Sequence, residues 1–211
     1  GPNIAFLCEY DALAGLGHAC GHNMIGVIST AAAIALTKHI EPCPGTVYVF
    51  GCPAEEGGVD NASAKAAYAD AGLFNDIGAA MQIHANGSHS VTTPHLAVDS
   101  WNIEFFGKPA HAAAFPEKGV NALDAMILFF SAVGLLRQQL KDDARLHGVI
   151  VHGGEAPNII PRYTLAKFYV RAETKEYCKE ICEKIDNIAK GAALATGCTY
   201  KMARYKNTVD N

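Results

Sequence analysis

The first half of the chain alternates short apolar runs with longer segments in which apolar residues recur every three or four positions. Short runs rich in β-branched and aromatic residues predict strands, and the longer spacing predicts packed helices. The expected strands are 4–9, 46–52 and 79–84, and the expected helices are 23–38 and 61–71. This order predicts an α/β domain with a mostly parallel sheet and helices on both faces.

The second half has a different pattern. Its expected strands are 98–107, 147–154, 164–172 and 199–205, and its expected helices are 119–140 and 175–195. The order β-α-β-β-α-β is that of an α+β ferredoxin-like sandwich, whose helices cover one face of the sheet. We therefore expect one domain over 1–96, a second over 97–206, and a linker at 207–211 that returns toward the first domain.

Polar side chains follow each expected strand of the first half. Glu9 and Asp11 come after the first strand, Glu55 and Glu56 after the second, and His84 closes the third. Open parallel sheets place their sites beyond the carboxyl ends of the strands. These five side chains are therefore expected at one edge of the sheet.

The stretch GHACGHN, residues 17–23, places two histidines and a cysteine within five residues. A Cys-x-His pair alone is a weak metal signal, and a turn with a buried thiol and imidazole explains it equally well. Side chains that can bind a metal follow all three expected strands. We therefore interpret GHACGHN as one half of a metal site rather than as a simple turn.

Glu55 and Glu56 need a physical explanation because neighbouring carboxylates repel each other when both are buried and ionised. A solvated loop is the ordinary reading of such a pair. Here the pair follows a core strand and lies between Pro53 and two glycines, and a bound cation would cancel the repulsion. One carboxylate is then a ligand and the other a base that takes a proton from the attacking water.

Composition limits the other possibilities. The formal net charge is −4 and the 17 lysines and arginines are scattered, which does not favour nucleic acid or anionic membrane as a partner. No apolar run reaches the roughly 20 residues needed to span a bilayer. The seven cysteines are an odd number and thinly spread, which is typical of reduced thiols in a cytoplasmic protein.

Three segments in order, YDALAGLGHACGHN, FGCPAEEGG and MQIHANG, resemble metallopeptidase family twenty (M20, clan MH). The likeness is greatest to its amidohydrolase branch of p-aminobenzoyl-glutamate hydrolases, auxin-conjugate hydrolases and dipeptidases, and it runs over nearly the whole chain. It implies a zinc-peptidase-like catalytic domain and a ferredoxin-like lid that forms a homodimer. It also implies two Zn²⁺ or Mn²⁺ ions and hydrolysis of N-acyl amino acids or dipeptide-like amides with a free carboxylate.

The same resemblance implies roles for individual residues. The implied metal ligands are Cys20, which would bridge the two ions as a thiolate, His22, Glu56 and His84. Glu55 would be the general base. Asp11 would hold a metal ligand in position without binding the metal itself.

In the second half, His111 resembles a histidine that reaches across the dimer to polarise the scissile carbonyl. Asn158 and Arg171 would bind the substrate carboxylate. Asn23 departs from the aspartate usual in the branch at that position.

Two alternatives stay open at this point. A cysteine hydrolase using Cys20 would leave Glu55, Glu56 and His84 without a purpose. A non-catalytic dimeric interaction protein derived from the family would not need the intact Glu55–Glu56 pair.

The resemblance also bears on completeness. A core strand at Ile4 with nothing before it, and a further histidine ligand that the family supplies from beyond the lid, suggest an internal fragment. Four ligands would leave one ion under-coordinated, so residues 1–211 alone are expected to hydrolyse amides poorly.

Overall fold

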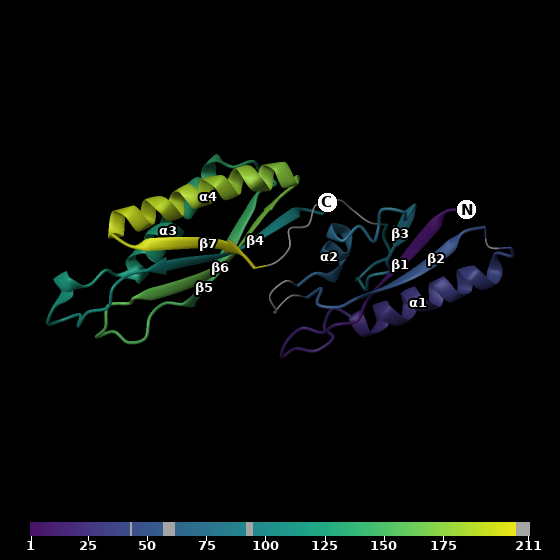
Figure 1. The fold of residues 1–211 in the computed structure, drawn as a ribbon, viewed down its shortest axis with the longest axis horizontal. Helices are drawn as coiled ribbons and strands as arrows, with labels where there is room; N and C mark the ends of the chain where they lie inside the picture. Colours follow the sequence, from purple (N-terminus) through teal and green to yellow (C-terminus); the bar gives the residue numbers. More distant parts are fainter. Residues whose placement is uncertain (43, 57–61, 92–94, 206–211) are drawn as a thin grey trace. The chain divides into compact units, whose positions relative to one another are not determined.

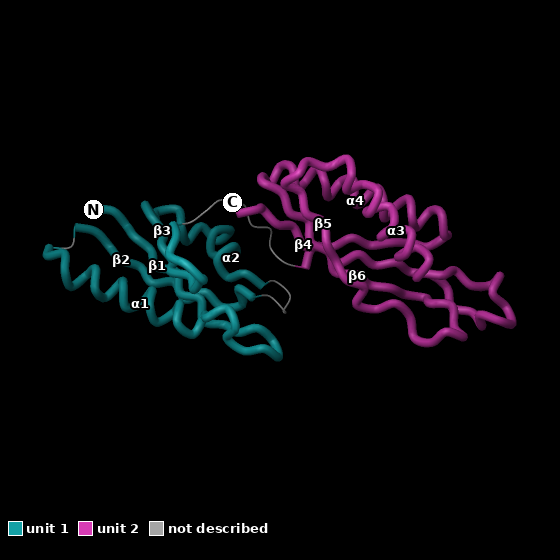
Figure 2. Tube along the Cα trace, turned by 180° about the vertical axis from the view of Figure 1, so that it is seen from behind, with its two compact units in different colours: residues 1–93 teal, residues 94–211 magenta. Residues whose placement is uncertain are grey.

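The computed structural model describes residues 1–42, 44–56, 62–91 and 95–205. The chain divides into two compact units, Gly1–Thr93 and Pro94–Asn211, and each is described by itself (Figure 2). Within the described residues, every helix is too short or too polar to cross a membrane.

Unit 1 is built on a three-stranded parallel sheet. Strand β1 (Asn3–Glu9) lies in the centre, with β2 (Thr46–Cys52) on one side and β3 (Ala79–Met81) on the other. The parallel sheet predicted from the alternating pattern is confirmed. Glu9 pairs with Cys52 in the register, so β1 and β2 end side by side and their following loops start from the same edge.

Two helices cover opposite faces of this sheet (Figure 1). Helix α1 (His22–His39) contacts β1 through Thr30, whose Oγ1 lies 3.6 Å from the Cys8 Sγ. Helix α2 (Ala64–Asp70) contacts the other face, where Lys65 pairs with Glu9. Successive side chains of a strand point to opposite faces, so neighbours Cys8 and Glu9 identify the two sides. The expected helices on both faces are confirmed.

Two elements of unit 1 differ from their predicted bounds. Strand β3 ends at Met81, because it pairs with β1 only over Ala79–Met81 and the backbone then leaves the ladder. His84 therefore lies in irregular chain rather than at the end of a strand. Helix α2 begins at Ala64, and the predicted start at Asn61 lies outside the described residues.

Unit 2 has the predicted β-α-β-β-α-β order. Its elements are β4 (Ala97–Phe106), η1 (Pro116–Lys118), α3 (Ala122–Leu136), η2 (Arg137–Gln139), β5 (Arg145–His152), β6 (Tyr163–Ala172), α4 (Lys175–Thr196) and β7 (Thr199–Arg204). The strands form one antiparallel sheet in the order β5-β6-β4-β7. Helices α3 and α4 lie on one face of it, which confirms the ferredoxin-like sandwich (Figure 1).

The ends of the helices in unit 2 follow from local capping. Asn121 accepts a hydrogen bond from the Leu123 amide, so α3 begins three residues later than the predicted start at 119. Thr174 caps α4 in the same way, and Gly197 ends it in the left-handed conformation. The predicted linker 207–211 lies outside the described residues.

We expect Phe129→Ala to destabilise unit 2 strongly. Phe129 is fully buried, and its ring lies 6.1 Å from Phe105 and 5.8 Å from Phe168 between centroids. Removing a buried phenylalanine costs about 3–5 kcal/mol. Urea unfolding of the protein measures the loss, with Leu194→Ala, a change at an 83% exposed side chain, as the control. Equal losses in both variants would show that Phe129 is not a core residue.

Candidate metal centre

The GHACGHN stretch turns sharply just before α1. Gly17 and Gly21 adopt the left-handed conformation, with φ of +79° and +78°, which side chains rarely accept. A Cβ at Gly21 would also lie 3.0 Å from the Ala85 Cβ. This turn places Cys20 and His22, which flank Gly21, against one common space.

His22 is the first residue of α1, and its side chain is only 1% exposed. Its Nδ1 lies 3.1 Å from Asp11 Oδ1, and Asp11 Oδ2 accepts a hydrogen bond of 3.0 Å from the Glu56 amide. A carboxylate only accepts, so Nδ1 of His22 carries the hydrogen. Nε2 is therefore the nitrogen left to face the site.

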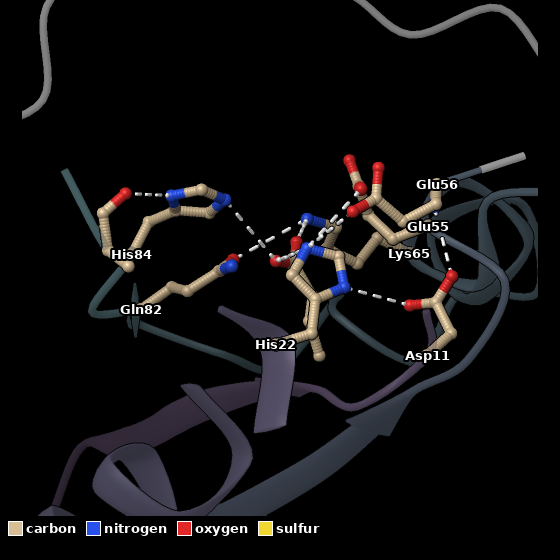
Figure 3. A network of polar contacts seen from close by, with 9 residues as sticks. Asp11, His22, Glu55, Glu56, Lys65, Gln82 and His84 are labelled. Carbon is tan, nitrogen blue, oxygen red and sulfur yellow. Dashed lines mark hydrogen bonds and ion pairs between the residues drawn. The ribbon is translucent and has the colours of Figure 1, made fainter. Parts of the chain in front are cut away.

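That Nε2 atom faces three carboxylates (Figure 3). Glu9 Oε2 lies 3.3 Å away, Glu56 Oε1 3.6 Å and Glu55 Oε2 3.8 Å. The Glu9 and Glu56 oxygens are buried and accept no hydrogen bond from any described residue. A hydrogen on Nε2 could bond to only one of these three oxygens at a time. A divalent cation binds several such atoms at once.

His84 presents its ring in the same way. Its Nδ1 lies 2.8 Å from the Ala85 carbonyl oxygen, which fixes the hydrogen on Nδ1. Its Nε2 lies 3.9 Å from Glu9 Oε2, and its ring stands edge-on to that of His22 at 5.9 Å. Both histidines thus turn Nε2 toward the buried Glu9 carboxylate.

Two sets of three ligand atoms have a spacing that suits a metal ion. Glu9, His22 and His84 form one, and Cys20, His22 and Glu56 form the other, with all atoms of each set within 4.8 Å of one another. Thiolate, imidazole and carboxylate are typical ligands of Zn²⁺. The described residues fit a metal centre, and the buried oxygens without donors are the decisive observation.

The Cys20 thiol depends on such an ion for its charge. Its hydrogen bond with Glu56, its partial desolvation and the nearby carboxylates raise the pKa of the thiol above its usual value. Without a cation it would therefore stay protonated at neutral pH, whereas a bound metal deprotonates a coordinating thiol.

Glu9 is ionised despite its burial. Burial alone would raise the pKa of this carboxyl, but hydrogen bonds from Lys65 and Gln82 and the charge of Lys65 lower it below its usual value. Lys65 Nζ donates to Glu9 Oε1 and also lies 3.4 Å from Gln82 Oε1. The site therefore keeps a charged carboxylate at the end of its central strand.

In unit 2, His111 and Asn158 lie side by side on two loops. The Ala112 amide donates to the Asn158 carbonyl oxygen, and both side chains are exposed. His111 Nδ1 lies 3.3 Å and 3.2 Å from the amides of Ala113 and Ala114, which donate to it. The hydrogen of the neutral ring is then on Nε2, so His111 presents a donor where His22 and His84 present acceptors.

Arg171 lies at the other end of strand β6. Asn158 precedes Tyr163, the first residue of the strand, whereas Arg171 is close to its end and stands over the Tyr169 ring at 5.6 Å. The eight residue-to-residue steps from Tyr163 to Arg171 span roughly 26 Å in an extended strand. One chain thus does not bring Asn158 and Arg171 together.

Comparison with known proteins decides the family. Residues 93–196 match the M20 peptidase dimerisation domain. The Xaa-Arg dipeptidase of Mus musculus is 40% identical over 216 residues, covering 99% of this chain and 49% of that protein. The chain belongs to the M20 peptidase family.

Two solved structures have a similar fold over the full length of this M20 chain. The aminobenzoyl-glutamate utilization protein from Klebsiella pneumoniae gives a TM-score of 0.71 at 26% identity, covering 100% of this chain and 52% of that one. A dinuclear metal-binding M20 peptidase from Bacillus subtilis gives 0.64 at 22% identity, covering 100% and 59%. The chain spans about half the length of these relatives.

Sequence reasoning placed Glu9 at this edge of the sheet without a role, and it missed the two residues that contact Glu9, Lys65 and Gln82. A glutamate that ends an apolar strand was a usable signal, because burying its charge requires a partner. Gln82 precedes His84 by two positions and so shares a face with it in extended chain. Nothing in the sequence connects Lys65 with Glu9.

We expect Asp11→Asn to lower the affinity for Zn²⁺ about 10- to 100-fold, because Asp11 orients both His22 and the Glu56 backbone without being in either ligand set. Titration of the metal-free protein with Zn²⁺ measures the change. Asp70→Asn, at an exposed position on α2, is the control and should leave the affinity unchanged. An unchanged affinity in Asp11→Asn would contradict the orienting role.

Proposed function

We propose that this protein is a metal-dependent amidohydrolase or dipeptidase that cleaves the amide bond of N-acyl amino acids or dipeptide-like substrates with a free carboxylate. The observation that carries the proposal is His22 Nε2, which faces three carboxylate oxygens, two of them buried with no hydrogen-bond partner among the described residues. The names of the relatives support the reaction class, since they include an Xaa-Arg dipeptidase and an aminobenzoyl-glutamate utilization protein.

Cys20, His22, Glu56 and His84 would hold two Zn²⁺ or Mn²⁺ ions, as in the dinuclear description of the Bacillus subtilis relative. Such ions lower the pKa of water and polarise a carbonyl when bound. The chain's own part is to fix the ligands: Asp11 sets the His22 ring, and the Ala85 carbonyl sets the His84 ring.

Glu55 and Glu56 differ in solvent exposure, and this difference suits them to different roles. Glu56 is 12% exposed and has a buried oxygen without a donor, which suits a ligand. Glu55 is 37% exposed and lies farther from His22 Nε2, which suits a base that must meet water and substrate. Glu55 takes the proton of the attacking water and returns it to the leaving nitrogen.

The donors of unit 2 suit the substrate's oxygens. His111 Nε2–H would donate to the carbonyl oxygen as negative charge develops on it. The Asn158 amide and the Arg171 guanidinium would bind the free carboxylate. Because strand β6 separates Asn158 from Arg171 within one chain, a carboxylate bound by both would need side chains from two chains.

A homodimer through unit 2 fits its surface. The outer strand β5 exposes Val149, Ile150 and Val151, and in the described sheet it pairs only with β6. Helix α3 exposes Ile127 and Leu135. Exposed apolar side chains on an edge strand and a nearby helix are typical of an interface between copies.

The surroundings of Cys20 disfavour the cysteine-hydrolase alternative. A nucleophilic cysteine needs a lowered pKa and a cationic neighbour. Here the Glu56 hydrogen bond and the neighbouring carboxylates raise the pKa of the thiol instead. An interaction protein without catalysis would have no need for the buried oxygens of Glu9 and Glu56.

We expect Glu55→Gln and Glu56→Gln to fail in different ways. Glu55→Gln should lower kcat about 10²- to 10⁴-fold with metal content unchanged, because a base is lost and no ligand. Glu56→Gln should lose metal as well as activity. A panel of N-acyl amino acids and dipeptides, including Xaa-Arg dipeptides and p-aminobenzoyl-glutamate, measures turnover, and metal analysis measures the ions. Equal metal loss in both variants would contradict this division of roles.

We also expect His111 to act on the substrate of the partner protomer. Mixing inactive His111→Ala protein with inactive Glu55→Gln protein should restore part of the activity, because one site of each mixed dimer keeps both groups. Subunit exchange is verified by native mass spectrometry, and each variant incubated alone is the control. Mixed dimers that form and stay inactive would show that His111 acts within its own chain or not at all.

A further inference from the structure

Glu9 occupies a costly position for a charge. It is the last residue of the central strand β1, and its side chain is 2% exposed. Burying an ionised carboxylate requires either a paired charge or a metal ion. The two carboxylate oxygens of Glu9 have different environments, and this difference indicates the role of the residue.

The Oε1 atom is held by the protein. Lys65 Nζ donates to it, and the same ammonium lies 3.4 Å from the Gln82 side-chain oxygen. Lys65 comes from α2 and Gln82 from the chain after β3, and Figure 3 shows the two side chains close together, so Gln82 helps to hold the ammonium that binds this oxygen.

The Oε2 atom points into the metal centre. It accepts no hydrogen bond, although His22 Nε2 lies 3.3 Å away and His84 Nε2 3.9 Å away. In each ring Nδ1 has another partner, Asp11 or the Ala85 carbonyl oxygen, so Nε2 is the nitrogen turned toward Oε2. One ligand atom each of Glu9, His22 and His84 thus lies within 4.8 Å of the others, a spacing that suits ligands around one cation.

The two ligand sets cannot both use His22. Its Nδ1 is committed to Asp11, so only Nε2 remains, and one lone pair binds one ion. If the ion at Cys20 and Glu56 takes that nitrogen, the other set keeps only Glu9 and His84 from its own members. Within that set, Glu9 is then the ligand that remains beside His84 for the second ion.

We propose that Glu9 is a ligand of one of the two ions through Oε2 alone, and that Lys65 is a positioning residue that keeps Oε1 away from the ion. This inference rests on the proposed function. It adds a fifth ligand to Cys20, His22, Glu56 and His84 and makes the central strand of the sheet part of the metal centre.

The test is Zn²⁺ binding to the intact protein, measured by equilibrium dialysis and metal analysis rather than by activity. The double variant Glu9→Gln/Lys65→Met removes the ligand and its partner together, so no unpaired charge stays buried. It should bind the first ion as the unsubstituted protein does and the second at least about tenfold more weakly. Lys38→Met with Glu41→Gln removes the same charges from exposed positions of unit 1 and should bind both ions normally.

Two further variants test the proposal even if the double variant does not fold. Glu9→Asp preserves the charge that Lys65 needs but withdraws the carboxylate by one methylene, so it should lose the second ion even if the double variant does not fold. Lys65→Met alone should keep both ions and change the visible absorption of bound Co²⁺, because Oε1 is released toward the ion.

Each negative result would overturn a different part of the proposal. Normal binding of both ions by the folded Glu9 variants would overturn the role of Glu9 and leave the proposed hydrolase intact. An unchanged Co²⁺ spectrum in Lys65→Met would overturn the positioning role of Lys65. An unsubstituted protein that binds no divalent ion would overturn the proposed function itself.

Discussion

The position of His22 Nε2 among three carboxylate oxygens is the constraint on which the rest of unit 1 depends. Carboxylates gathered in a mostly buried space are stable only beside a positive charge. Lys65 supplies one at Oε1 of Glu9, whereas Oε2 of Glu9 is the oxygen near His22. The remaining imbalance is what makes a divalent ion the natural occupant.

The fold brings these groups together by simple means. Strands β1 and β2 run parallel and end level with each other, so Glu9, Asp11, Glu55 and Glu56 leave the sheet at one edge. Asp11 then connects three segments, since it accepts from His22 with one oxygen and from the Glu56 backbone with the other. Ala54, with φ of +56°, turns the chain just before the two glutamates. A few backbone conformations therefore fix the direction of several ligands.

Most of this could be predicted from the sequence because strand ends and glycine positions are local signals. The alternating pattern predicted the parallel sheet, and the motif order pointed to Cys20, His22, Glu56 and His84, which the structure brings into two groups that share His22. The pairing of Lys65 with Glu9 could not be predicted, because 56 positions separate them. It depends on how α2 sits on the sheet, where Tyr68 donates to the Gly51 carbonyl oxygen and packs against Phe50. Similarly, the 13 positions between Asn158 and Arg171 hide their separation, because an extended strand carries them apart.

The two units offer opposite chemistry. The candidate residues of unit 1 are mainly acceptors, which bind cations and repel a carboxylate. Those of unit 2, His111, Asn158 and Arg171, present donors, which bind carbonyl and carboxylate oxygens and have no affinity for a divalent ion. An amide substrate with a free carboxylate needs both kinds of group, one to activate water and one to hold its oxygens. Placing both kinds in one small site would let the arginine pair with the ligand carboxylates and compete with the metal. The candidate ligands lie on unit 1 and Arg171 lies on unit 2, so neither unit by itself pairs the arginine with the ligand carboxylates.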